Sequence, residues 1–104
     1  MEVTPQEVKS RLERGDRLVL VDVREPWEVQ LVSLKEAQHI PMEEMPWRVE
    51  ELNPEDEVVV LCHTGVRSGM VVQWLRSQGF GRAWNLQGGI DAWARTVDST
   101  LRRY

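Results

Sequence analysis

Two uninterrupted apolar runs stand out along the chain, at residues 18–21 (Leu-Val-Leu-Val) and 58–61 (Val-Val-Val-Leu). Each has the length of a strand, and neither alternates apolar with polar side chains. Strands that are apolar at every position are typically buried on both faces, as in parallel sheets. Two further short strands are predicted, one at 39–41 that ends at a proline and one at 83–86.

Helical signals separate these runs. Thr4-Pro5-Gln6-Glu7 combines an N-cap residue, a proline in the first turn and a glutamate three positions after the cap, which predicts a helix that ends near Gly15. Further helices are predicted at 26–31, at 43–52 with a weak point at Pro46, and from Gly88-Gly89 to about residue 95. Residues 32–38 show no clear period.

Another helix is predicted at 68–78. It has one apolar face, made of Met70, Val71, Trp74 and Leu75. Its end is marked by Gly79, and Phe80 is expected to pack back onto the helix as in a Schellman ending. Buried strands that alternate with helices indicate an α/β fold with a mostly parallel sheet. With 104 residues and no repeat or linker, residues 1–104 are expected to form one domain.

Composition narrows the function classes. The hydrophobic share of 41% and the charged share of 29% are ordinary for a globular protein, and the net charge of −4 with interspersed signs argues against broad nucleic-acid binding. No apolar run approaches the ~20 residues of a membrane span, and the N-terminus lacks the segments of a signal peptide. One cysteine can form neither an internal disulfide nor a cysteine-based zinc site. We therefore expect a cytoplasmic protein without a metal or organic cofactor.

Five tryptophans are many for this length. Trp74 and Trp93 fit helix faces that turn toward the core. Trp27 and Trp47 fall in less regular segments, where they would suit either an exposed partner surface or core packing. Core packing is the preferred interpretation.

Candidate chemistry centres on the single cysteine. Cys62 directly follows the run at 58–61, and Asp22 directly follows the run at 18–21. Both are therefore expected at the carboxyl edge of the sheet, where α/β proteins bind ligands. The loop after Cys62 leads into a helix whose N-terminus is predicted near Ser68. That loop consists of His63, Thr64, Gly65, Val66 and Arg67.

The loop has the properties of an anion site. Its N–H groups and the helix N-terminus attract negative charge, and Gly65 lets the backbone curl around a ligand. Arg67 adds a permanent cation that can bind an oxyanion. A thiol in such a field is expected to have a lowered pKa, which suits a nucleophilic cysteine acting on an anionic substrate. The alternative is that Cys62 is a buried, inert residue.

Loop length discriminates between reaction classes. Phosphotyrosine-type phosphatases use a His-Cys-x5-Arg loop, whereas here Arg67 lies one position closer to Cys62, and Leu61 takes the place of the histidine. The shorter loop should close around something smaller than phosphate, such as a single sulfur atom on the cysteine. The spacing therefore disfavours a cysteine phosphatase or an arsenate reductase.

Three motifs in order resemble the rhodanese-like sulfurtransferases. They are the loop Cys62-x-x-Gly65-x-Arg67-Ser68, the segment 20–26 (Leu-Val-Asp-Val-Arg-Glu-Pro) followed by Glu28, and the segment 87–93 (Gln-Gly-Gly-Ile-Asp-Ala-Trp). The resemblance implies a single-domain member with a five-stranded, mostly parallel sheet between layers of helices. One departure is that the family's Gly-His-Ile-Pro-Gly-Ala-like stretch corresponds to 32–37, where Ser33 takes the histidine position and His39 lies elsewhere.

The resemblance also implies a mechanism. The Cys62 thiolate would take the outer sulfur of a small anionic donor such as thiosulfate and become a persulfide, which N–H groups from His63 to Ser68 would stabilise. A second nucleophile, such as cyanide, a thiol or a protein acceptor, would then remove the sulfur in a ping-pong cycle.

Other residues near the site receive structural interpretations. Asp22 and Arg24 are expected to form an ion pair or cap that holds neighbouring loops, with a functional role as the alternative. His63 is expected to be a solvent-facing loop residue, and the alternative is that it lines the mouth of the pocket and influences substrate choice. Ser68 is expected to cap the helix.

A second hypothesis for the whole domain is a rhodanese-fold module that binds or regulates a partner without turnover. The presence of Cys62, Gly65 and Arg67 favours the enzyme, because a binding module would not need a thiol at this position.

Overall fold

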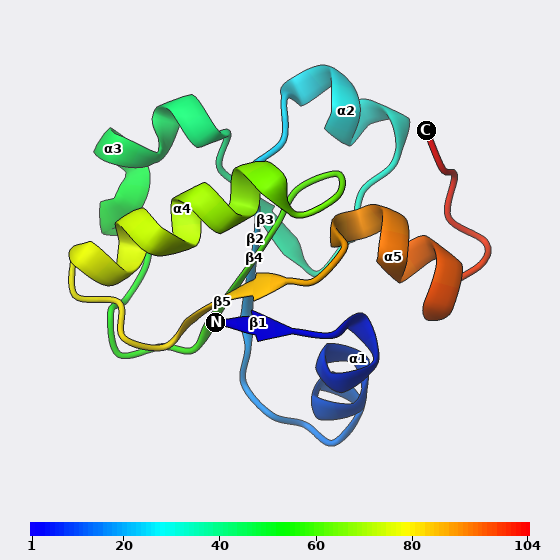
Figure 1. The fold of residues 1–104 in the computed structure, drawn as a ribbon, viewed down its shortest axis with the longest axis horizontal. Helices are drawn as coiled ribbons and strands as arrows, with labels where there is room; N and C mark the ends of the chain where they lie inside the picture. Colours follow the sequence, from blue (N-terminus) through cyan, green and yellow to red (C-terminus); the bar gives the residue numbers. More distant parts are fainter.

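The structure is a computed structural model that describes residues 1–104. Its centre is a five-stranded sheet in the order β1-β5-β4-β2-β3, and all neighbouring strands pair in parallel (Figure 1). The strands are β1 (Glu2–Val3), β2 (Val19–Asp22), β3 (Ala37–His39), β4 (Val58–Leu61) and β5 (Ala83–Leu86). The helices are α1 (Pro5–Glu13), α2 (Pro26–Leu31), α3 (Met45–Arg48), α4 (Val66–Ser77) and α5 (Gly89–Thr96). The predicted α/β fold is confirmed.

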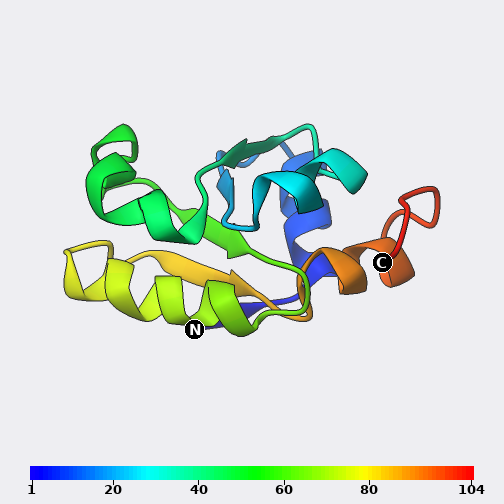
Figure 2. The same ribbon diagram turned by 90° about the horizontal axis from the view of Figure 1, so that it is seen from above.

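Two apolar clusters cover the two faces of the sheet. Val58, Val60 and Cys62 belong to the cluster under α3 and α4, whereas Val59 and Leu61 belong to the cluster under α1 and α5 (Figure 1). β4 is thus buried on both sides, as its continuous apolar run predicts. In Figure 2, the arrowheads of β4 and β5 point toward the end of the molecule where α2, α5 and the C-terminus lie. This end is the carboxyl edge of the sheet.

Local signals at two helix ends work as predicted. The Thr4 hydroxyl accepts the Glu7 N–H at 3.1 Å, and the Glu7 carboxylate accepts the Thr4 N–H at 3.2 Å, which forms a capping box. At the end of α4, the Phe80 N–H donates to the Leu75 carbonyl at 3.1 Å and the Gly79 N–H to the Arg76 carbonyl at 3.2 Å. These are the two hydrogen bonds of a Schellman ending.

Other elements differ from prediction. The segment predicted as one helix at 43–52 is a 3-10 turn at Met42–Glu44, the short helix α3 and a second 3-10 turn at Val49–Glu51. Pro46 lies in the first turn of α3, where its missing N–H costs least. The strand expected at 39–41 is β3, two residues earlier, and β1 was not predicted at all.

The prediction for α4 was wrong in its start and in part of its apolar face. The helix begins at Val66, so Ser68 lies inside its first turn. The buried stripe also differs from the predicted one: Val71, Val72 and Leu75 are buried, whereas Met70 is 56% exposed. Trp74 packs against the core as expected.

The expectation of buried tryptophans fails at two positions. Trp27 is 61% exposed and Trp47 67% exposed, so core packing is the wrong interpretation for both. Each lies near the start of a short helix at the surface, where one turn leaves little room to bury a large ring. Trp93, in contrast, is buried as predicted.

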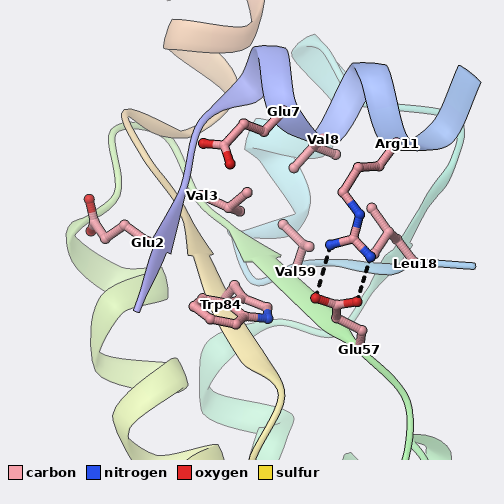
Figure 3. A pocket seen from close by; sticks show the side chains of 9 residues that line it. All are labelled: Glu2, Val3, Glu7, Val8, Arg11, Leu18, Glu57, Val59 and Trp84. Atoms are coloured by element: carbon pink, nitrogen blue, oxygen red, sulfur yellow. Dashed lines mark hydrogen bonds and ion pairs between the residues drawn. The ribbon is translucent and has the colours of Figure 1, made fainter. Parts of the chain in front are cut away.

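A cavity of about 140 Å³ lies between α1 and the sheet. Arg11 lines the cavity and pairs with both carboxylate oxygens of Glu57, at 2.7 and 2.9 Å (Figure 3). The ring of Trp84 lines it as well. Glu57 precedes β4, so the cavity sits at the amino edge of the sheet, opposite Cys62. None of the helices combines the length and the apolar character that a membrane span requires.

Candidate active site

Cys62 lies at the carboxyl edge of the sheet, where β4 ends and the chain turns into α4. Asp22 lies beside it on β2, because Asp22 pairs with Leu61 in the register of the two strands. The turn depends on Gly65, whose φ of 108° is in the left-handed region that favours glycine. Cys62 itself is buried.

The Cys62 sulfur is surrounded by hydrogen-bond donors. The Gly65 N–H lies 3.1 Å from Sγ, and the Ser68 Oγ lies 3.2 Å from it. Burial raises the pKa of the Cys62 thiol, but hydrogen bonds from the Ser68 hydroxyl and from the backbone N–H groups of Ser68, Gly65 and Thr64 outweigh it. The resulting pKa is lower than that of an ordinary cysteine, which increases the fraction of thiolate at neutral pH.

The prediction that Ser68 caps α4 is wrong. The N-cap is Gly65, and the Ser68 side chain is fully buried between Cys62 and Asn85. The prediction failed because the helix begins two residues earlier than its sequence signals indicate. Thr64 and Val66 have exposed side chains, so the loop turns its backbone rather than these side chains toward the sulfur.

Arg67 forms a two-pronged ion pair with Glu28 of α2. Its Nη1 and Nη2 atoms lie 2.6 and 2.8 Å from the two Glu28 carboxylate oxygens. Glu28 also accepts the Glu25 N–H at 2.9 Å, which fixes the carboxylate at the start of α2. The hydrogen bonds from Arg67 lower the pKa of Glu28 to about 2, despite the opposing effect of burial.

We expect this ion pair to make folding stability depend on acidity. Glu28 stays ionised in the folded protein to about pH 2, whereas its ordinary pKa is 4.5, so the pair contributes fully above pH 4.5 and is lost as the pH falls toward 2. Chemical unfolding measures the free energy of unfolding at pH 6 and at pH 2. Between these two pH values, the free energy of unfolding should fall by about 3 kcal/mol less for Glu28→Gln than for the unmodified protein. Glu13→Gln, which removes an exposed surface ion pair, is the control. Its free energy of unfolding should fall by the same amount as that of the unmodified protein. Equal losses for Glu28→Gln and the unmodified protein would contradict this prediction.

Asp22 and Arg24 form a buried ion pair beside the loop, in agreement with the structural interpretation. Arg24 Nη2 lies 2.7 Å from Asp22 Oδ2, and both side chains are almost completely shielded from solvent. Arg24 also donates to the carbonyl of Val32 at 2.7 Å, which ties the segment at 32–37 to the site. His39 points to the same region, with Nε2 2.7 Å from the Arg24 carbonyl oxygen.

The C-terminal residue reaches the loop as well. The ring of Tyr104 stacks on His63 with centroids 3.9 Å apart and an interplanar angle of 7°. Its hydroxyl donates to Glu28 Oε2 at 2.7 Å and accepts from Arg24 at 2.9 Å. His63 is therefore half-buried under an aromatic ring rather than free in solvent, and Tyr104 joins the two ion pairs of the site.

Helix α5 holds the loop from the other side. The Ile90 N–H donates to the Cys62 carbonyl at 2.9 Å, and the Asp91 N–H donates to the His63 carbonyl at 3.1 Å. Gly89 lies against both carbonyls with a φ of 63°, so the glycine pair allows the helix to approach the loop closely. This contact explains why the motif at 87–93 accompanies the cysteine loop.

Sequence reasoning did not assign Glu28, Tyr104 or Asn85 to the site. Glu28 was noted only as part of a motif, and its partner Arg67 lies 39 positions away in the sequence. Asn85 could have been found as the single polar residue in a strand that otherwise reads as apolar. No local signal marks Tyr104.

Comparison with known proteins agrees with the architecture. The family model for the rhodanese-like domain matches residues 4–96. A protein of Allochromatium vinosum named sulfurtransferase is 37% identical over 94 residues, which cover 90% of this chain and 88% of that protein. The thiosulfate sulfurtransferase GlpE of Vibrio cholerae is 36% identical over 76 residues, or 73% of this chain and 72% of that protein.

A solved structure extends the likeness over the full length. The crystal structure of a rhodanese-like domain protein from Staphylococcus aureus superposes with a TM-score of 0.86 and 31% identity, covering 100% of this chain and 99% of that one. Fold, motif order and sequence similarity thus agree, and the chain belongs to the rhodanese-like domain family.

Proposed function

We propose that the protein is a sulfurtransferase that carries sulfur as a persulfide on Cys62. The observation that supports this most strongly is the setting of the Cys62 sulfur, a buried thiol whose pKa is lowered by the donors around it. Such a thiol is a nucleophile at neutral pH, and the same donors can stabilise the negative charge of a persulfide. The relatives named as sulfurtransferases support the same activity.

The reaction with thiosulfate as donor proceeds in two displacements. The Cys62 thiolate attacks the outer sulfur of thiosulfate; the sulfur–sulfur bond of the donor breaks, and its electron pair leaves with sulfite. A thiophilic acceptor, such as cyanide, a thiol or a thiol on a protein, then attacks the outer sulfur of the persulfide. The Cys62 thiolate leaves with the electron pair and is ready for another cycle.

The loop residues have separate roles in this scheme. The backbone N–H groups from His63 to Ser68, including those of Thr64, Gly65 and Val66, bind the persulfide. Arg67 binds the anionic donor with the N–H groups that its pairing with Glu28 leaves available. Asp22 and Arg24 support the loop from behind. A single catalytic thiol that must stay reduced fits the cytoplasm.

Intact-mass spectrometry tests the proposal. The reduced protein, exposed briefly to thiosulfate and freed of small molecules, should gain the mass of one sulfur atom. Cyanide should remove this mass, and Cys62→Ser should never acquire it. Glutathione persulfide, a sulfur donor of a different chemical class, is the second donor to use.

A protein that gains no sulfur from either donor would contradict the proposal. The binding-module hypothesis would then stand, and hydrolysis of an aryl phosphate would decide whether Cys62 acts instead as a phosphatase nucleophile.

A further inference from the structure

Asn85 of β5 is a buried polar residue that connects the sheet to the cysteine loop. It is 5% exposed and lies on the face of β5 that turns toward α4. Its Nδ2 donates to the Gly65 carbonyl at 3.0 Å and to the Glu2 carboxylate at 2.8 Å. Its Oδ1 accepts the Ser68 hydroxyl at 2.6 Å.

These contacts fix the orientation of the amide. Both N–H groups of Nδ2 are used by acceptors, and the Gly65 carbonyl can only accept. The oxygen of Asn85 must therefore face Ser68. The reverse orientation would place Oδ1 against the Gly65 carbonyl oxygen and the Glu2 carboxylate.

Ser68 has one hydroxyl hydrogen but two acceptors. Asn85 Oδ1 lies 2.6 Å from its oxygen, and Cys62 Sγ lies 3.2 Å from it. A hydroxyl donates one hydrogen at a time, so the two acceptors compete. Both distances are within hydrogen-bond range for their acceptor atoms. An amide oxygen is a stronger acceptor than a neutral thiol sulfur, so Asn85 is well placed to hold this hydrogen when the sulfur is neutral.

We propose that Asn85 is a positioning residue for the Cys62 nucleophile: it holds the Ser68 hydroxyl while Cys62 is a thiol and releases it to the sulfur when Cys62 becomes a thiolate. The change is a rotation about the Ser68 Cβ–Oγ bond, and no covalent bond to Ser68 breaks. In the thiol state the Cys62 S–H can donate to Ser68 Oγ in return. This role rests on the proposed function, because it concerns the thiolate that would attack the sulfur donor.

The rotation has a cost that opposes thiolate formation. When the hydroxyl turns to the sulfur, the buried Oδ1 of Asn85 loses its donor. The Oδ1 atom of Asn85 therefore makes the Cys62 thiolate harder to form, whereas its Nδ2 atom holds the loop in place through the Gly65 carbonyl. An apolar residue at position 85 would remove the competing acceptor, whereas a carboxylate would compete more strongly.

Several charged groups surround Cys62. Arg67 of α4 is paired with Glu28 of α2, and Asp91 of α5 is paired with Arg95 and Arg103. Glu2 of β1 lies behind Asn85, Asp22 and Arg24 pair beside the loop, and His63 follows Cys62. Substitutions confined to Asn85 and Ser68 that add no charge leave all of these charged side chains unchanged. The variants then differ only in the Asn85 amide and the Ser68 hydroxyl.

The test is the pH dependence of Cys62 alkylation by iodoacetamide, which reacts with the thiolate and requires no sulfur transfer. Asn85→Leu and Asn85→Ala should each move the midpoint of the profile about one pH unit down, because both remove the competing acceptor and neither adds a charge. In a Ser68→Ala background both substitutions should leave the midpoint unchanged. Asn53→Leu, in an exposed turn, serves as the control for the Asn-to-Leu change and should have no effect.

Unchanged midpoints in both variants, or shifts that persist without the Ser68 hydroxyl, would overturn the proposal in favour of a purely structural role. If Asn85→Leu fails to fold, Asn85→Ala with and without Ser68→Ala decides the question alone, because alanine removes the acceptor without adding bulk or charge. The sulfur-uptake measurement is independent. Predicted shifts without sulfur uptake would reject the sulfurtransferase and keep the role of Asn85.

Discussion

Replacing Gly89 with alanine is expected to lower the free energy of unfolding by roughly 3–5 kcal/mol and to slow any reaction at Cys62. A Cβ atom at this position would overlap the carbonyl groups of Cys62 and His63, and neither can move freely because each accepts an N–H from α5. The positive φ adds strain for any residue other than glycine. The backbone at the nucleophile must shift to relieve the overlap.

Thermal unfolding and Cys62 alkylation measure the two effects. A loss of this size corresponds to a fall in Tm of roughly 10 °C or more for a domain of this length. Gly81→Ala is the matched control, because its Cβ would meet nothing within 4 Å and its φ is not in the left-handed region. Equal Tm values for Gly89→Ala and Gly81→Ala would show that α5 does not constrain the loop.

The second large effect is expected for Arg24→Lys, which keeps the charge but should lower the free energy of unfolding by roughly 3 kcal/mol. Arg24 uses all three guanidinium nitrogens: Nε and Nη2 bind the Asp22 carboxylate, Nη2 also binds the Val32 carbonyl, and Nη1 binds the Tyr104 hydroxyl. A lysine has one nitrogen at the end of a flexible chain and cannot reach these partners together. Buried acceptors would remain without donors.

Urea unfolding of Arg24→Lys measures this loss. Arg17→Lys is the control, because Arg17 has an 80% exposed side chain and one surface partner, and its replacement should change the free energy of unfolding by no more than about 0.5 kcal/mol. If both variants unfold at the same urea concentration, the Asp22–Arg24 pair is not a stabilising element of the loop.

Features that depend on nearby residues were predictable from sequence. The apolar runs that became β2 and β4, the Thr4–Glu7 capping box and the Gly79–Phe80 ending each depend on residues a few positions apart. The placement of Cys62 and Asp22 at one edge of the sheet follows from the strand ends, because parallel strands share their direction. These features could be predicted because they depend only on neighbouring residues and on the direction of the strands.

Contacts between distant residues were not predictable from a single sequence. Arg67 pairs with Glu28 across 39 positions, and Tyr104 reaches Glu28 across 76. Neither partner carries a local sign of the other. The start of α4 was missed for a different reason: a polar serine before an apolar stretch resembles a cap, but Gly65 already provides the turn, so the helix begins earlier.

The strand order has a consequence for how the protein is made on the ribosome. β1 pairs only with β5, so residues 2–3 have no strand partner until residues 83–86 have been synthesised. The cysteine loop also waits for later segments, because Asn85 and the start of α5 are both made after it. Pairings between such distant segments also fold slowly. A nascent chain therefore carries Cys62 without Asn85 and α5 until residues 83–96 have been made, and the complete setting of the reactive thiol forms late in folding.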